Sequence, residues 1–458
     1  MLSHRSLSRR NLLQVGALGI GGVTLADLLR AEGAKSGAKQ TRKAVINIHL
    51  DGGPPQMDLI DPKPEAPREV RGEFEPIATK LPGVMFTELL PQLAQIADRL
   101  ILIRSLVGAD GNHDAFQCQS GYLAKELQSL GGRPALGCVA AKLLGAKGDA
   151  APTFVDLMQG RPMVRNSARA GFLGPAYQAF RPDISHLFHR ELEAGMVTEL
   201  AQRGHQTTSL TLNPTLTFSR LRERLELCHE LDALRKEVDR TGMMGAVDDF
   251  SQQAVGILTS GRLAEALDLS REDPAVLKRY RPSTQVSALE TSEGSDAALK
   301  LLLARRVIEA GVRCVSISLS DYDTHSNNFK IMRNIGPVLD HALSTLILDL
   351  EERGLLQDVA VVVWGEFGRT PQINNNAGRD HWPNVGMAIL AGGGWPAGRV
   401  IGATDRTASR AISQPVHYQD VIATLYKHLG IDLQTTLTDP SGRPQHLLEI
   451  GLPLRDLA

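Results

Sequence analysis

Six short apolar runs divide the chain and predict the strands of one sheet. They span residues 45–50, 100–106, 153–158, 313–319, 359–364 and 387–391, and most are rich in β-branched residues. Nearly continuous apolar runs of this length are typical of strands that are buried on both faces of a parallel sheet. The pattern therefore predicts a sheet with no face open to solvent.

Two amphipathic helices are predicted between the later runs. Residues 296–310 place apolar side chains along one stripe and end at Gly311, and residues 338–353 do the same and end at Gly354. A glycine directly after such a stripe is typical of a helix C-terminus. Alternating helices and strands predict right-handed crossovers, and hence a sheet covered by helices on both sides.

Residues 161–282 interrupt this pattern with charged, helix-rich sequence and no clear pair of strands. We expect a helical insertion or cap that packs over the sheet, within one α/β domain that spans residues 42–458. A chain of 458 residues, 42% of them hydrophobic, is long enough to bury such a core.

The first 38 residues have the pattern of an export signal. Arg5, Arg9 and Arg10 precede an apolar run from Leu12 to Leu29, which small residues follow. The segment Ser8-Arg9-Arg10-Asn11-Leu12-Leu13 matches the twin-arginine pattern, which the export machinery reads on folded proteins. We therefore expect a periplasmic or secreted protein. After processing, no run approaches the roughly 18 apolar residues that a membrane span needs, so the mature form is expected to have no stable membrane span.

Charge and cysteine content narrow the possible partners. With 50 Lys+Arg against 51 Asp+Glu, the formal charge is -1, and no basic stretch is interleaved with aromatic residues. We therefore expect no nucleic-acid partner, and any charged ligand must be held by a local site. The four cysteines form no Cys-x-x-Cys pair, which argues against a thiolate zinc site. Whether any of them form a disulfide is left open.

Acidic and histidine side chains follow several of the predicted strands. In open parallel sheets, ligands bind beyond the carboxyl ends of the strands. Asp51 ends the first run, and Asp321 and His325 follow the run 313–319, with Asp323 able to join them. Asp and His on one loop can direct an oxygen and a nitrogen onto one divalent cation. The alternatives are a simple Asp-Gly turn at Asp51 and an ordinary hydrogen-bonded loop at Asp321.

Glu366 directly follows the run 359–364. It is expected at the same edge of the sheet as Asp51 and Asp321. Three carboxylates placed together repel one another unless a cation or protons neutralise them, which favours a metal. Arg369 offers a planar fork for a phosphate or sulfate, although an ion pair with one of these acids is equally consistent with the sequence.

Two further clusters complete the candidate site. Asp380 and His381 precede the run 387–391, with His381 as a ligand or acid and Asp380 as a ligand or orienting partner. His113 and Asp114 follow the run 100–106 and precede a predicted helix, whose backbone N–H groups could hold an anion. The alternative for this segment is a helix N-cap made by Asn112 or Asp114.

These motifs resemble the exported bacterial family known as domain of unknown function 1501, over nearly the whole mature chain. The matching segments are Asp51–Asp58, Asp61–Pro64 with Arg71-Gly72, Ile103–Ser105, Gly365–Pro371, Gly378–Pro383 and Gly392–Gly394. That family is similar to the alkaline phosphatase and sulfatase superfamily. The resemblance implies an alkaline-phosphatase-like three-layer αβα sandwich with a mostly parallel central sheet and a helical insertion.

The resemblance also implies metal ligands, because alkaline phosphatases hold two zinc ions. The metal ligands that we predict are Asp51, Asp321, His325, Glu366, Asp380 and His381. Glu366-Phe367 stands where the superfamily has Asp-His, which leaves one metal position short of a nitrogen ligand, for which Asp380 could compensate. The segment expected to offer a Ser or Thr nucleophile is here Asn112-His113-Asp114, and the formylglycine signature of sulfatases is absent.

We therefore predict a metal-dependent hydrolase of phosphate or sulfate esters, with a small-molecule or glycan ester as substrate. The expected cofactor is a divalent metal, zinc first, with calcium or manganese as alternatives. The predicted catalytic residues are His113 or Asp114, as nucleophile or proton carrier, and Arg369, which would hold the anion. The competing hypothesis is a binding or scaffold protein that keeps the fold without catalysis. A phosphomutase of the same superfamily is disfavoured by the export signal.

Overall fold

The fold is seen in a computed structural model, which describes residues 43–146, 149, 151–158, 168–182, 184, 261–282 and 295–457. The predicted export signal lies outside these residues, as does most of the predicted insertion at 161–282. Within the described part, no helix is both long and apolar enough to cross a membrane.

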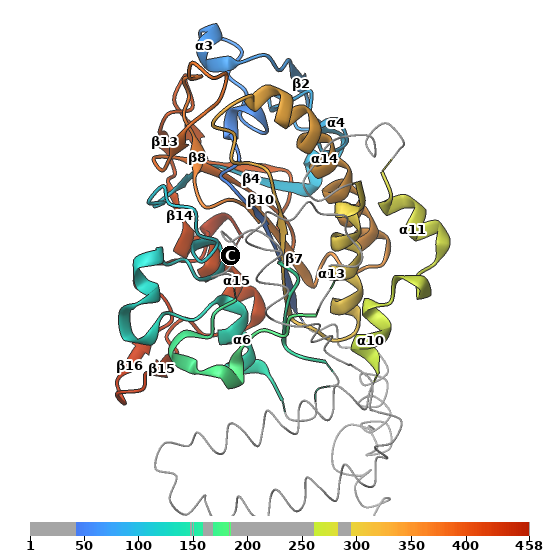
Figure 1. The fold of residues 1–458 in the computed structure, drawn as a ribbon, viewed down its shortest axis with the longest axis vertical. Helices are drawn as coiled ribbons and strands as arrows, with labels where there is room; N and C mark the ends of the chain where they lie inside the picture. Colours follow the sequence, from blue (N-terminus) through green and yellow to red (C-terminus); the bar gives the residue numbers. More distant parts are fainter. Residues whose placement is uncertain are drawn as a thin grey trace, which may run out of the picture. The chain divides into compact units, whose positions relative to one another are not determined.

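An eight-stranded sheet forms the centre of the described fold (Figure 1). Its strands are β1 (Ala44–Leu50), β4 (Leu100–Val107), β5 (Phe154–Asp156), β6 (Cys314–Leu319), β7 (Val359–Trp364), β10 (Gly386–Gly392), β11 (Arg399–Ile401) and β14 (Val416–His417). In space they follow the order β11-β4-β10-β7-β1-β6-β5, and β14 also pairs with β4. All six apolar runs of the sequence are strands of this sheet.

The sheet is mostly parallel, as predicted. β1 runs parallel to β6 and β7, β5 runs parallel to β6, and β11 and β14 run parallel to β4. Within this sheet, β10 is reversed, because it is antiparallel to both β4 and β7. Since Ala388 lies opposite Trp364, the start of β10 meets the carboxyl end of β7. The connection between them therefore leaves and returns at the same edge of the sheet.

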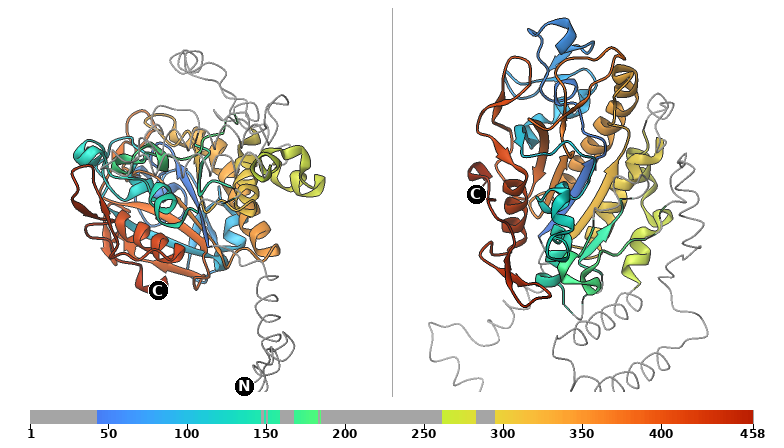
Figure 2. Two further views of the ribbon diagram at one scale, coloured as in Figure 1. Left: turned by 90° about the horizontal axis from the view of Figure 1, so that it is seen from below. Right: turned by 60° about the vertical axis from the view of Figure 1, so that its left-hand side comes forward.

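Helices cover both faces of the sheet, so the predicted three-layer αβα sandwich is confirmed (Figures 1 and 2). One layer holds α4 (Pro91–Gln95), α10 (Arg262–Leu267), α11 (Pro274–Tyr280), α13 (Leu299–Glu309) and α14 (Asn328–Glu352). The other holds α5 (Gln117–Ser120), α6 (Leu136–Leu144) and α15 (Tyr418–Leu429). The two helices predicted from the sequence are α13 and α14, and α14 begins well before its predicted start.

The central strand β1 shows how the two layers share the sheet. All seven of its residues are buried. Because successive side chains of a strand point to opposite faces, Ile46 and Ile48 join the core under α13 and α14, whereas Val45 joins the core under α6 and α15. Asn47 and His49 share the face of Val45, so this face becomes polar toward the carboxyl end of the strand.

Smaller elements complete the described fold. The remaining α-helix of the described residues is α3 (Arg68–Arg71), and several single-turn 3-10 helices lie in the connections. Short two-stranded ladders join β2 (Pro76–Ala78) to β3 (Met85–Thr87), β8 (Gly368–Arg369) to β9 (His381–Trp382), β12 (Ala403–Thr404) to β13 (Ala411–Ser413) and β15 (Thr436–Thr438) to β16 (Pro444–His446). Cys118, Cys138 and Cys314 are buried free thiols.

Candidate functional site

Four loops meet at one edge of the sheet and carry the candidate residues. They follow β1, β4 and β6, and the fourth joins β7 to β10. β1, β4, β6 and β7 run in the same direction, so their carboxyl ends lie at one edge. The reversal of β10 returns the fourth loop to this edge, where β8 and β9 pair and Arg369 lies opposite His381.

Four side chains form a group that we call the outer cluster: His113, Asp323, His325 and His381. Their potential ligand atoms all lie within 4.8 Å of one another. His325 Nε2 is 3.0 Å from His381 Nε2 and 3.2 Å from Asp323 Oδ1. His113 Nε2 lies 3.4 Å from the same carboxylate oxygen, and His381 Nε2 lies 3.7 Å from it. The cluster is partly exposed, so a ligand can reach it from solvent.

The second nitrogen of each outer-cluster histidine faces an acceptor. The Nδ1 distances are 2.7 Å from His325 to Asp380 Oδ1, 2.7 Å from His381 to the Gly111 carbonyl and 2.9 Å from His113 to Glu366 Oε1. A histidine that donates through Nδ1 keeps its lone pair on Nε2. With all three rings neutral, as metal binding requires, three Nε2 lone pairs and one carboxylate oxygen converge, with the orienting acceptors that are typical of metal-binding histidines.

A second group, the inner cluster, consists of His49, Asp51 and Glu366, all fully buried. His49 Nε2 lies 3.4 Å from Glu366 Oε2 and 3.9 Å from Asp51 Oδ1. Among the described residues, both ring nitrogens of His49 and the Oε2 atom of Glu366 lack a hydrogen-bond partner. Buried polar atoms that lack partners are costly. A cation held by these atoms would satisfy them, so the residues present fit a divalent metal.

His113 links the two clusters and carries a shifted pKa. Burial lowers the pKa of His113, but hydrogen bonds with Asp323 and Glu366 outweigh burial and raise it to about 9. Burial raises the pKa of Asp323, but hydrogen bonds from His113, His381 and Arg369 outweigh it and hold this pKa far below its usual range. The pKa of His49 is lowered by burial, which the charge of Glu366 opposes only in part. The charges of the two clusters are therefore strongly linked.

Two glycines allow the loops to approach closely enough to build the clusters. Gly52 has a φ of +115°, and a Cβ there would collide with the backbone nitrogen of Asp323. Its own N–H donates to Glu366 Oε1 at 3.0 Å. A Cβ at Gly378 would collide with the carbonyl group of His325. Both positions therefore need a residue without a side chain.

Arg369 binds the loops to one another. Its side chain is fully buried, and Nε donates to the Gly53 carbonyl at 3.0 Å, Nη1 to the Arg379 carbonyl at 2.8 Å, and Nη2 to the Gly52 carbonyl. Nη2 also lies 2.7 Å from Asp323 Oδ1. This arrangement favours the ion pair over the predicted grip on an anion, because the guanidinium is already committed to protein acceptors.

The structure brings several of the sequence-predicted residues to this edge. Asp51 and Glu366 belong to the inner cluster, and His325 and His381 to the outer one. His113, predicted as a catalytic residue, lies among the potential ligands. Their binding of metal stays a prediction.

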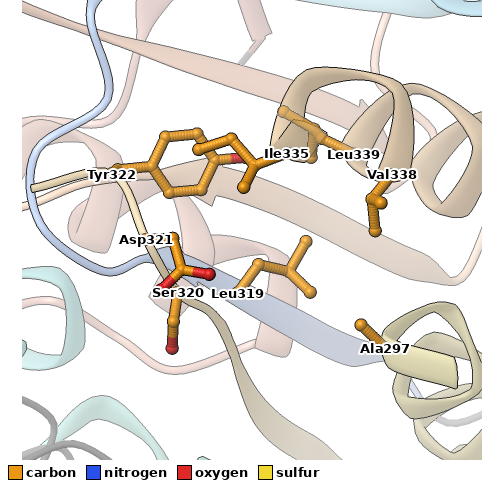
Figure 3. Close-up of a pocket in the computed structure, with 8 residues that line it drawn as sticks. All are labelled: Ala297, Leu319, Ser320, Asp321, Tyr322, Ile335, Val338 and Leu339. Atoms are coloured by element: carbon orange, nitrogen blue, oxygen red, sulfur yellow. The ribbon is translucent and has the colours of Figure 1, made fainter. Parts of the chain in front are cut away.

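Three of the predicted acidic residues lie outside both clusters: Asp380, Asp114 and Asp321. Asp380 lies outside both clusters and orients His325 through Nδ1. Asp114 Oδ1 accepts a hydrogen bond from the Phe116 backbone at 2.8 Å, in the turn before α5, whose N-cap is Phe116 and not the predicted Asn112 or Asp114. Asp321 is in neither cluster of the described residues and lines a small pocket between the end of β6 and α14 (Figure 3). The chain turns at Asp321, where φ is 79°, and Asp323 is the acid that meets His325.

His49 is not among the metal ligands predicted from the sequence. Its signal is the alternation along β1 and just beyond its end, where Asn47, His49 and Asp51 occupy every second position and the strand is otherwise apolar. Polar residues at this spacing share one face. The resemblance implied a metal position without a nitrogen ligand beside Glu366, and His49 lies 3.4 Å from that carboxylate.

The sequence of this chain matches one family model over residues 42–457, described as "Protein of unknown function (DUF1501)". The chain belongs to this family. The family predicted from the motifs of this chain is therefore confirmed. No curated protein matches the DUF1501 chain.

Solved structures similar to this DUF1501 chain include hydrolases of two kinds. The PsFucS1 sulfatase from Pseudoalteromonas sp. is 12% identical with a TM-score of 0.38, over 89% of this chain and 70% of that chain. The phosphonate monoester hydrolase SpPMH from Silicibacter pomeroyi is 11% identical with a TM-score of 0.36, over 86% and 74%. The phosphonate monoester hydrolase of Agrobacterium radiobacter is 13% identical with a TM-score of 0.32, over 85% and 74%.

Proposed function

We propose that this protein is a metal-dependent hydrolase of phosphate or sulfate esters. One observation carries the proposal: three histidine Nε2 atoms and one carboxylate oxygen converge in the partly exposed outer cluster. Each histidine presents this nitrogen because its Nδ1 faces an acceptor. The fully buried inner cluster lies next to it, joined through His113 and Glu366.

The donor set favours zinc. Imidazole nitrogens with one carboxylate suit Zn²⁺, whereas Ca²⁺ takes oxygen ligands and suits the outer cluster poorly. The inner cluster, with one imidazole and two carboxylates, suits zinc or manganese. A divalent cation held in this way supplies Lewis acidity, which activates a water molecule and stabilises negative charge on the transferring group.

The residues around the clusters hold the geometry and move protons. Hydrolysis joins a water oxygen to phosphorus or sulfur and releases an alcohol, so one proton must leave the water and one must reach the ester oxygen. We propose Asp114 as the proton carrier, because it adjoins His113 on the same loop, whereas His113 belongs to the outer cluster itself. Asp380 and the Gly111 carbonyl hold His325 and His381 in place.

Water is the nucleophile that this site favours. The described loop at 108–116 contains no Ser, Thr or Cys, so it offers no hydroxyl or thiol to attack the ester. The same observation, together with the committed guanidinium of Arg369, favours the second candidate function, a binding or scaffold protein without turnover. Metal content does not separate these two functions, whereas turnover does.

The proposal includes the route and the substrate class. The twin-arginine pattern in residues 8–13 supports export to the periplasm or beyond, through the twin-arginine machinery. An exported hydrolase would meet small-molecule or glycan esters. Fusion of residues 1–38 to a reporter that is active only after folded export tests this, with Arg9→Lys and Arg10→Lys together as the blocked control.

The function is tested on protein that is purified without chelator. Elemental analysis should find bound zinc or manganese, and a panel of phosphomonoesters, phosphodiesters and sulfated sugars should include one class that is turned over. A metal-loaded protein that turns over no member of the panel would favour the binding protein. A protein that holds no metal and turns over nothing would overturn both the metal site and the hydrolase.

A further inference from the structure

Two residues of the family motifs hold no place in either cluster, yet both are fully buried: Asp58 and Arg379. They form a two-pronged ion pair, with Nε 2.8 Å from Oδ2 and Nη2 2.9 Å from Oδ1. Arg379 also donates to the carbonyls of Val70, Thr370 and Pro371. All five N–H groups of its guanidinium therefore have acceptors, and the arginine is fixed in one position.

The ion pair belongs to a closed ring of hydrogen bonds. Asn328, the first residue of α14, donates through Nδ2 to Asp58 Oδ2 at 2.7 Å. Its Oδ1 accepts from Thr324 Oγ1 at 2.7 Å. The ring closes through the backbone, because Arg379 N donates to the Thr324 carbonyl at 2.9 Å. All four side chains are buried, so water does not compete for these bonds.

The ring lies directly behind the outer cluster. Thr324 stands between Asp323 and His325, and Arg379 stands two residues before His381. The bond from Arg379 N to the Thr324 carbonyl ties these two loops together. This bond, together with the one from Asn374 Nδ2 to the His325 carbonyl at 3.0 Å, joins the two loops whose His325 and His381 Nε2 atoms lie 3.0 Å apart.

We propose that Asp58, Thr324, Asn328 and Arg379 are positioning residues that set the geometry of the outer cluster for its cation. This inference rests on the proposed function, because it assumes that the outer cluster binds metal. Changes to residues that orient metal ligands typically weaken metal binding by about 10–100-fold. The inner cluster is built from β1 and Glu366, outside the ring, so its affinity should not change.

The test uses Thr324→Val, which keeps the shape of the side chain and removes the hydroxyl that the ring needs. Thr324→Ser keeps the hydroxyl and serves as the rescue variant. Thr87→Val is the matched control, because Thr87 is also a buried threonine and donates to the Asp58 carbonyl at 2.8 Å, outside the ring. Cobalt(II) is the probe, since its visible absorption reports each occupied site, and His325→Gln and His49→Gln identify the outer and inner signals.

We expect Thr324→Val to weaken cobalt binding at the outer cluster by about 10–100-fold and to leave the inner cluster within about twofold of the wild type. Thr324→Ser and Thr87→Val should bind cobalt as the wild type does, even if Thr87→Val melts at a lower temperature. Unchanged outer-cluster affinity in Thr324→Val would overturn the positioning role alone. Equal weakening of both clusters would also overturn it, because that pattern indicates general loss of structure.

A wild-type protein that binds no cobalt would overturn the proposed function itself, and the positioning role with it. If Thr324→Val is recovered only as aggregate, Asn328→Ser makes the same break, because the shorter side chain cannot reach Asp58. It is judged by the same comparison of outer and inner affinities.

Discussion

His325 and His381 face each other with their Nε2 atoms 3.0 Å apart. Each ring has its Nδ1 next to an acceptor, Asp380 Oδ1 for His325 and the Gly111 carbonyl for His381. Two neutral rings in these tautomers would bring two lone pairs together, which is unfavourable unless a cation or an added proton lies between them. A cation bound between these two rings would therefore stabilise the outer cluster.

Removal of either ring should empty the outer cluster. We expect His325→Ala and His381→Ala each to lose the outer cation and to lower kcat by about 100-fold or more, since each change deletes a ligand. Elemental analysis and turnover of the best ester in the panel measure the two effects. His446→Ala, on exposed strand β16, is the control and should match the wild type. Full metal content in His325→Ala would contradict the assignment of this ligand.

The sequence predicted the sheet well because burial on both faces leaves a strong pattern. The run 359–364 and strand β7 have the same bounds, and β1, β4, β6 and β10 differ from their runs by one residue at one or both ends. The sequence does not indicate the direction of β10, because a strand that is buried on both faces has the same apolar pattern whether it is parallel or antiparallel to its neighbours. Because β10 is reversed, the loop between β7 and β10 returns to the edge where β1 and β6 end, and His381 on this loop lies beside those ends.

The site was predicted less completely, for reasons of local geometry. Asp321 and Asp323 lie on the same loop, and the turn at Asp321 decides which acid meets His325. A single positive φ of this kind is not visible in the residue types alone. His113 was expected as a catalytic residue, but its distance from Asp323 depends on how the loop after β4 folds back, which is a tertiary effect.

Arg369→Lys should destabilise the protein, because an ammonium group cannot reach all the acceptors that the guanidinium holds together. We expect the free energy of unfolding to fall by about 2–4 kcal/mol in urea denaturation. Arg410→Lys is the control, since the Arg410 side chain is 76% exposed. An unchanged free energy of unfolding, with a KM raised severalfold, would instead favour the original hypothesis that Arg369 grips the substrate.

Gly52→Ala should damage both the fold and the site. The Cβ would collide with the Asp323 backbone at a φ of +115° that non-glycine residues rarely adopt. We expect a loss of about 1–3 kcal/mol in the free energy of unfolding, together with reduced metal content. Gly83→Ala is the matched control, because Gly83 also has a positive φ but has open space around its Cβ position. If both variants behave alike, the close approach at Gly52 does not matter to the site.

Asp340 offers a test of stability away from the clusters. This carboxylate on α14 accepts hydrogen bonds from the backbone N–H groups of Gln92 and Leu93, at 3.0 and 2.7 Å, and so caps the start of α4. Burial raises the pKa of Asp340 to about 6, from an ordinary value of 3.8, although the two N–H donors oppose this shift. The folded state therefore holds this proton at pH values where the unfolded chain has released it.

The sign of the resulting pH dependence follows from that difference. Between about pH 4 and 6, the folded protein binds more protons than the unfolded chain, so the contribution of Asp340 to the free energy of unfolding should fall as pH rises, by at most about 3 kcal/mol. Asp340→Asn cannot titrate, so the stability of the wild type relative to this variant should decline through this window and become constant above it. Asp432→Asn, at an exposed position, should follow the wild type. If the relative stability of the wild type instead rises with pH, the two N–H donors outweigh burial, and Asp340 caps α4 as a charged group.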